Sequence, residues 1–171
     1  SLKLVRPRVP NGEFIDNFNP LESWRGFQEG NAVQYTFFVP QHPYRLIEKV
    51  GKEELNNRLD SIFTEARKSI FGGGKITYAF AGVESPYNHG NQPSLHIPWL
   101  FNFSGKPYLT QKWTRLICDE FYGTNGEHGY GYGQDEDQGQ LGAWYVMAAM
   151  GLFDVQGGSC ERPTFQIGSP L

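Results

Sequence analysis

Three acidic residues stand together in a glycine-rich stretch at residues 133–140 (GQDEDQGQ). Asp135, Glu136 and Asp137 repel one another and raise each other's pKa, so their clustering does not serve stability. Asp135 and Asp137 alternate around Glu136, and in an extended turn their side chains point the same way. This spacing suits two carboxylates that share a water molecule or a cation, and we interpret the stretch as a functional site.

An uncharged, strongly apolar stretch, residues 141–151 (LGAWYVMAAMG), follows the acids directly. It predicts a buried helix over about 138–150, with the acidic turn at its N-terminal end. Because Asp137 is a good N-cap candidate, capping of this helix is the alternative interpretation of the acids. An EF-hand interpretation of Asp135-x-Asp137-x-Gly139 is weak, because no Glu follows at the required position.

Apolar residues recur at spacings of three and four in several other segments, and these elements must position the acids. They predict helices over 31–39, from Pro43 to about 50, and over 52–70, 93–103 and 108–122, joined by long polar loops. Cys118 falls on the apolar side of one helix and is expected to be a buried thiol. Cys160 lies in a polar loop, and a disulfide cannot be inferred from the sequence. No strand–helix alternation occurs, which favours an all-α array of helical hairpins.

Composition limits the classes of function that the chain can have. The 171 residues suffice for a real core, and the net charge of −3 without a basic patch argues against nucleic acid as a partner. No stretch approaches the roughly 20 apolar residues of a membrane span. The first residues lack the apolar core of a signal peptide. Aromatic residues make up 15% of the chain and are interleaved with Asn, Gln, His and Gly, as in sugar-binding clefts, although most single rings belong to a core.

Three ordered segments carry a resemblance to a known family. Residues 27–40 (FQEGNAVQYTFFVP) resemble the EGNxWQYxxFVPxD segment of family-92 glycoside hydrolases, which are bacterial exo-acting α-mannosidases. Residues 87–94 (YNHGNQPS) resemble the family's GNEPS, and residues 133–145 its G-x-[DE]-D-x-G-Q-x-x-A-W-Y. The closing residues 167–171 (IGSPL) resemble its IGSPL/F tail. Together these segments span nearly the whole chain, which makes the resemblance far more specific than one motif would be.

The family is much longer and pairs an N-terminal β-sandwich with a large (α/α)6 toroid. The resemblance implies an all-α chain whose helical hairpins form the later half of that toroid, with a short irregular or β tail. Residues 1–152 would be a partial catalytic domain, and residues 153–171 a tail leading back toward a β-sandwich that is absent from this chain. We therefore expect a piece of a longer protein that requires the missing N-terminal part for activity. The resemblance also implies a periplasmic, cell-surface or secreted protein.

Family members are inverting and calcium-dependent. By resemblance, Glu29 matches the general acid, and Asp135 and Asp137 match the acids that activate water as general base. In inverting enzymes such carboxyls stand about 6.5–9.5 Å apart. The implied activity is hydrolysis of terminal α-linked mannose, with α-1,2 the expected linkage, from glycans such as N-glycans.

A general acid must hold its proton near neutral pH, so Glu29 would need a pKa raised by partial burial. Its neighbours Phe27, Tyr35 and Phe37 favour such burial. The alternative is that Glu29 merely lies before a helix, at the positive end of its dipole.

The remaining candidates are polar residues of the same motifs. Calcium takes six to eight oxygen ligands, and Asn91, Gln92 and Asp137 are the candidate metal ligands. Candidate substrate-binding residues are Gln34, His89, Asn91 and Gln92, and His96 is a further sugar donor, although a lone His is more often structural. Trp99, Trp144 and Tyr145 are expected in the core.

Three departures from the family pattern stand at Val33 in place of Trp, at Gln92 in place of Glu, and at Gln138 in place of the usual Cys or Asn. The first two bear on substrate preference and metal affinity more than on the reaction. Two alternatives stay open: a non-catalytic helical carbohydrate-binding or interaction module with degenerate acids, and a different glycosidase or lyase that shares a helical toroid. Retention of Glu29, Asp135 and Asp137 favours the enzyme.

Overall fold

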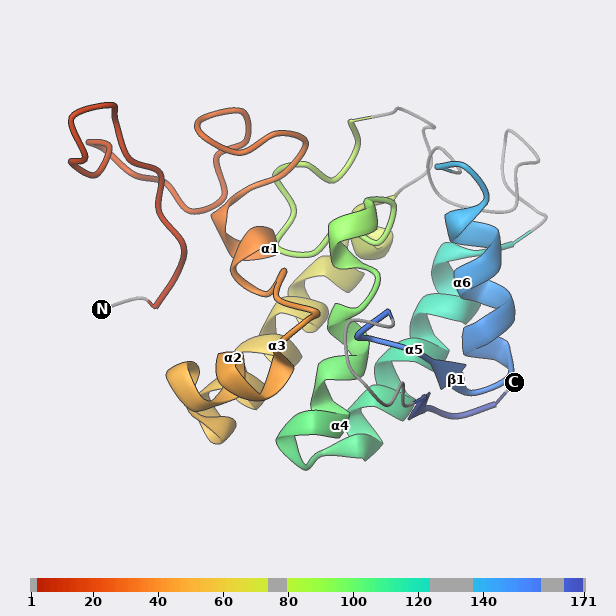
Figure 1. Cartoon of the computed structure of the whole chain (residues 1–171). Coiled ribbons are helices and arrows are strands. Elements are labelled where there is room, and N and C mark those ends of the chain that lie inside the picture. The colour runs from red at the N-terminus through yellow and green to blue at the C-terminus, as the bar shows by residue number, and fades with distance from the viewer. Residues whose placement is uncertain (1–2, 74–79, 124–136, 158–164, 171) are drawn as a thin grey trace.

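The computed structural model describes residues 3–73, 80–123, 137–157 and 165–170. Helices dominate these residues, and the only regular strands among them form a two-stranded sheet (Figure 1). The expected all-α fold with a short β tail is therefore confirmed. The elements are α1 Ala32–Thr36, α2 Pro43–Val50, α3 Lys52–Arg67, η1 Ile70–Gly72, η2 Gln92–Ser94, η3 Ile97–Trp99, α4 Leu100–Ser104, α5 Pro107–Phe121, α6 Gln140–Ala149, β1 Leu152–Phe153 and β2 Gln166–Ile167.

The two longest helices build the centre of the core. Both α3 and α5 bury one apolar face, as their periodicity predicts. Phe63 of α3 stacks on Trp113 of α5 with ring centroids 5.3 Å apart. The core also includes Cys118, where burial raises the thiol pKa to about 12, so the expected buried thiol is confirmed. Cys160 lies outside the described residues.

Helix ends follow local chemistry where the signals are strong. Pro43 begins α2, and Gly51 ends it with a φ of 96°, in the left-handed region that suits glycine. The side chain of Asn31 accepts hydrogen bonds from the backbone N–H groups of Val33 and Gln34 and so caps α1. The predicted helix over 31–39 is shortened to Ala32–Thr36.

Two predicted helices differ in the structure. The continuous helix over 93–103 is wrong: the segment consists of the 3-10 turns η2 and η3 followed by the five-residue α4. Pro93 and Pro98 lack the N–H that an α-helix interior requires, which accounts for the break. The helix predicted over 52–70 ends at Arg67, because Ile70 and Phe71 adopt left-handed φ angles of 50° and 54°.

The apolar helix after the acids, which was expected to be buried, is buried on one face only in this chain. Trp144 is buried as expected, but Tyr145 is 36% exposed, Val146 55% and Met150 51%. Tyr145 is therefore not a core residue here, whereas Trp99 is fully buried.

The tail folds back onto the helices. β1 and β2 pair antiparallel, with Leu152 opposite Ile167. A Cβ on Gly168 would lie 2.9 Å from the Trp99 ring, so this position has no room for a side chain. Asn102 donates a hydrogen bond to the carbonyl of Ile167, and Arg115 donates one to the carbonyl of Pro170.

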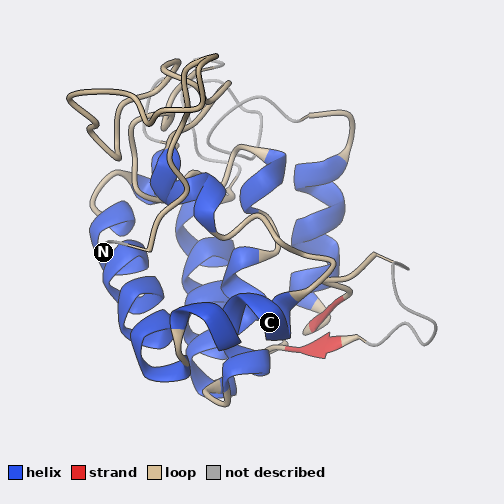
Figure 2. Cartoon of the chain, turned by 60° about the vertical axis from the view of Figure 1, so that its left-hand side comes forward, coloured by secondary structure: helices blue, strands red, loops and turns tan. Residues whose placement is uncertain are grey.

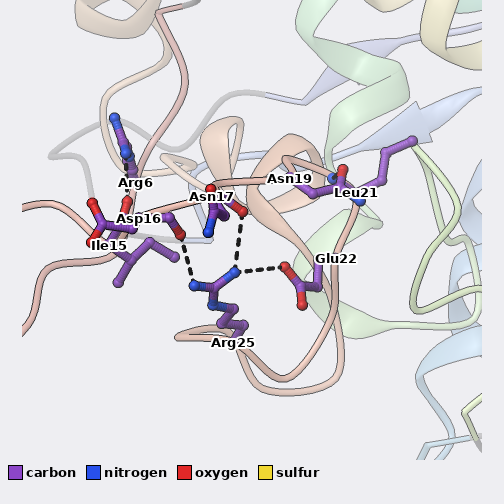
Figure 3. Close-up of polar contacts among 8 residues, drawn as sticks. All are labelled: Arg6, Ile15, Asp16, Asn17, Asn19, Leu21, Glu22 and Arg25. Carbon is purple, nitrogen blue, oxygen red and sulfur yellow. Dashed lines mark hydrogen bonds and ion pairs between the residues drawn. The ribbon is translucent and has the colours of Figure 1, made fainter.

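Residues 3–31 form loops that lie mainly at one end of the helices (Figure 2). Arg25 organises part of them, donating to the backbone carbonyls of Asp16 and Asn17 and pairing with Glu22 at 3.3 Å (Figure 3). Loop 80–91 and the start of α6 lie at this same end (Figure 1). The described parts of three motif segments, around Glu29, in loop 80–91 and at the start of α6, therefore lie toward the same end of the helices.

Candidate active site

Two of the motifs are joined by one hydrogen bond. The side-chain amide Nδ2 of Asn91 donates to the backbone carbonyl of Glu29 at 2.6 Å. Asn91 is 8% exposed, so this bond lies largely out of water. The structure therefore brings Glu29 and Asn91 together, although 62 residues separate them.

The carboxyl of Glu29 has a different environment from the one expected. Glu29 is an exposed residue in this chain, so the expected partial burial is wrong here. The expected aromatic neighbour is present in Tyr35, where burial and then the negative charge of Glu29 raise the phenol pKa. Phe27 stacks on Tyr35 with centroids 5.6 Å apart. Glu29 thus stands at the edge of an aromatic pair, open to solvent.

The backbone around Glu29 is constrained on both sides. Glu29 has a φ of 54°, which is uncommon for a residue other than glycine and is typical of functional sites and turns. A Cβ on the buried Gly30 would meet Gln34 Oε1 at 2.8 Å and the Tyr35 ring at 2.9 Å. The glycine of the motif is therefore needed for the close approach of the backbone to α1.

The amide residues that follow hold a neighbouring loop in place. Asn31 donates to the carbonyls of Val83 and Ser85, and Gln34 donates to those of Gly82 and Ser85. Gln34 is 2% exposed, and both of these bonds go to the neighbouring loop. A substrate-binding role for Gln34 stays a prediction that these contacts do not support. The clamp formed by Asn31 is a feature that the sequence interpretation missed; an Asn just before a helix is its only local signal.

Gln92 lies on the wall of a cavity of about 360 Å³ that opens to solvent. Gln140, three residues after Asp137, lines the same cavity and was not singled out from the sequence, although it is the Gln of the third motif. Apolar and aromatic side chains make up most of the remaining wall, with Asp154 as an acidic member. The cavity therefore connects the second and third motifs.

His96 also lines this cavity, but its Nε2 atom is bonded to another part of the protein. Its Nε2–H donates to the carbonyl of Phe37 at 2.8 Å, and burial lowers its pKa to about 4. The ring is therefore neutral near pH 7. A sugar-donor role for His96 stays a prediction.

His89 lies deeper still and is fully buried. Its ring nitrogens both contact phenol oxygens, Nδ1 that of Tyr87 at 2.7 Å and Nε2 that of Tyr122 at 2.8 Å. Burial lowers its pKa to about 3. A substrate-binding role for His89 stays a prediction that these contacts do not support, because both nitrogens already have protein partners.

The turn before α6 carries Asp137. Residues Asp137, Gln138 and Gly139 have successive left-handed φ angles of 58°, 62° and 87°. Gly139 is the N-cap residue of α6, so the alternative that Asp137 holds the N-cap position is wrong. Asp135 and Glu136 lie outside the described residues.

The candidate metal ligands offer oxygen atoms. The bond from Asn91 Nδ2 to Glu29 identifies the nitrogen end of that amide, so Oδ1 is the atom a cation would contact. With Gln92 and the carboxylate of Asp137, the donor set is chemically suited to calcium rather than to a soft transition metal. Within the described residues, no three His, Cys, Asp or Glu side chains form a group that could hold a metal ion.

Comparison with known proteins agrees with the motif arrangement. The family model of the glycosyl hydrolase family 92 catalytic domain matches residues 1–171. The chain therefore belongs to glycoside hydrolase family 92. A comparison with curated proteins finds no match.

Solved structures of the family share the fold. The family-92 α-mannosidase BT3965 of Bacteroides thetaiotaomicron is 33% identical, with a TM-score of 0.77, over 99% of this chain and 20% of its own. Its complex with mannoimidazole matches at 30% identity and a TM-score of 0.76, over 99% of this chain and 22% of its own. The inverting mannosidase BT2199 of the same organism is 32% identical, with a TM-score of 0.75, over 98% of this chain and 23% of its own. The chain thus spans between a fifth and a quarter of the length of these relatives.

No helix among the described residues is both long and apolar enough to cross a membrane.

Proposed function

We propose that the longer protein to which this chain belongs releases terminal α-linked mannose, with α-1,2 the preferred linkage, from glycans such as N-glycans. The observation that carries the proposal is the Asn91–Glu29 hydrogen bond, which joins two family motifs at the end of the helices where α6 begins. Membership of family 92, and the description of one solved relative as an inverting mannosidase, support the reaction class.

In the proposed reaction, Glu29 protonates the leaving glycosidic oxygen, and Asp135 with Asp137 takes a proton from the attacking water on the opposite face of the sugar. Water adds at the anomeric carbon as the bond to the aglycone breaks, so the product mannose has the β configuration. Glu29 is exposed in this chain, and covering by the rest of the longer protein would supply the low dielectric that a general acid needs.

Asn91, Gln92 and Asp137 would hold calcium. When bound, the ion would grip vicinal hydroxyls of the mannose ring and favour its distortion. The neutral Gln92 in place of the family's Glu lowers the negative charge of the site, which predicts weaker calcium binding. We also propose a periplasmic, cell-surface or secreted location, and a requirement for the N-terminal part of the longer protein.

The first experiment is hydrolysis of mannose-α-1,2-mannose by the full-length protein, with and without a calcium chelator, followed by NMR of the anomeric proton. Chelator-sensitive release of β-mannose is the expected result. Release of α-mannose first would contradict the inverting mechanism. A folded protein that binds mannosides without releasing mannose would instead be a carbohydrate-binding module.

A further inference from the structure

A buried histidine connects the second motif to the helix that follows the acids. His89 precedes Asn91 by two residues, and its ring contacts Tyr122, the residue directly after α5. The phenol of Tyr122 in turn donates to the backbone carbonyl of Leu141, in the first turn of α6, at 3.0 Å. Three separate segments thus meet through the ring of His89.

The direction of each hydrogen bond follows from the last one. A carbonyl can only accept, so the single phenol hydrogen of Tyr122 goes to Leu141. The Tyr122 oxygen must then accept from His89 Nε2–H, and Nδ1 accepts from the phenol of Tyr87. One tautomer of neutral His89, with the proton on Nε2, satisfies all of these hydrogen bonds. We call this chain of bonds, from Tyr87 through His89 and Tyr122 to the Leu141 carbonyl, the relay.

Packing also restrains the His89 ring. Trp144 meets the His89 ring edge-on at a centroid distance of 4.3 Å, and Tyr122 stacks on Trp144 at 5.9 Å with planes 7° apart. Trp144 itself donates from Nε1 to the carbonyl of Leu95. The relay therefore cannot move without moving α6 or the segment around η2.

Both ends of the relay lead to candidate catalytic groups. On one side, Asn91 bonds the carbonyl of Glu29. On the other side, Gln140 is the residue before Leu141, and its backbone N–H donates to the carbonyl of Asp137. The distance between the candidate acid and the candidate base turn thus depends on how the η2 segment sits against α6.

We propose that His89 is a positioning residue, which through Tyr122 and Leu141 sets the place of the Asp137 turn relative to Glu29 and Asn91. This inference rests on the proposed mannosidase function. It differs from a sugar-binding role, because His89 would touch neither substrate nor metal, and it differs from a purely structural role, because the reaction rate depends on it more than folding does.

The test is Tyr122→Phe in the full-length protein, which keeps both stacked rings and removes only the bridging hydroxyl. Replacement of His89 itself risks misfolding, so the milder variant is the primary one. We expect kcat for mannose release to fall about 10–100-fold while KM changes about two-fold or less, since displacement of a catalytic group by about 1 Å costs rate rather than binding.

The matched control is Thr110→Val. Thr110 also donates a buried hydroxyl hydrogen bond to a backbone carbonyl, that of Pro98, but it lies in the first turn of α5, away from Tyr122. It should lower the melting temperature about as much as Tyr122→Phe and leave kcat unchanged.

Wild-type activity separates the two levels of inference. If the wild type releases mannose and folded Tyr122→Phe keeps its kcat within two-fold, or if both variants lose activity only in proportion to folded protein, the positioning role is overturned. If the folded wild type releases no mannose, the proposed function fails and the role of His89 in that reaction fails with it.

Discussion

Asn91 holds the backbone of Glu29 from across the site, by a 2.6 Å hydrogen bond to its carbonyl. Glu29, which accepts this bond, has a φ of 54°, an unfavourable value for a residue other than glycine. A conformation of this kind persists only where the surroundings stabilise it. Asn91 therefore serves two segments at once, since it belongs to one motif and restrains the candidate acid of another.

Replacement of Asn91 by Ala in the full-length protein should lower kcat/KM for mannose release at least about 10-fold, because Glu29 loses its restraint. Steady-state hydrolysis of the disaccharide measures this. Asn102→Ala is the matched control, since Asn102 also donates to a backbone carbonyl but lies in α4. An equal loss in both variants would contradict a specific role for Asn91.

Glu29→Gln and Asp137→Asn should each lower kcat by about 10²–10⁴-fold or more, as expected for a lost general acid or base. Asn tolerates the left-handed backbone that Asp137 adopts, so Asp137→Asn should leave folding intact. Circular dichroism checks the fold and single-turnover hydrolysis checks the chemistry. Unchanged turnover in folded Asp137→Asn would remove Asp137 from the mechanism.

Gln34→Leu should destabilise the full-length protein by about 1–3 kcal/mol, because the partly buried carbonyl of Gly82 loses its side-chain donor. Calorimetry measures the melting temperature, with Gln111→Leu on the exposed side of α5 as control. If Gln34→Leu instead kept the melting temperature and raised KM, Gln34 would be a substrate ligand after all.

Acidification should destabilise the fold through its buried histidines. Burial lowers the pKa of His89 to about 3 and of His96 to about 4, below the value of about 6.5 in an unfolded chain. From pH 6.5 down toward 4, the unfolded state binds protons that the folded state does not, so stability falls by up to about 1.4 kcal/mol per pH unit for each histidine.

Melting temperatures at pH 7, 6 and 5 measure this loss. His96→Gln keeps a donor for the carbonyl of Phe37 without a titrating group, and its melting temperature should fall less steeply with pH than that of the wild type. Parallel slopes would contradict the contribution of His96.

The parts of the fold that were predictable from the sequence depend on short-range patterns. The periodicity of α3 and α5 and the Pro–Gly boundaries of α2 are local, and they are confirmed. The segment around η2 and η3 was not predictable by periodicity, because its apolar spacing is helical while Pro93 and Pro98 prevent a continuous α-helix.

The site was predictable in its membership more than in its contacts. The motifs indicated Glu29 and Asn91, but no local signal shows that one bonds the other's backbone. Gln34 has the residue type of a cleft amide, yet it bonds the carbonyls of Gly82 and Ser85, which lie about fifty positions away in the sequence. A uniformly apolar helix such as α6 likewise gives no indication of which face this chain covers.

Gly168 presses directly against the Trp99 ring, with no space for even a methyl group. The requirement is steric and not conformational, so the two positions should covary among family members. Where a relative has Ala or a larger residue at the position of Gly168, we expect a smaller ring or an aliphatic side chain at that of Trp99, and an alignment of the family tests this. The residue type at the position of Gly168 would then indicate the size of the core side chain at that of Trp99.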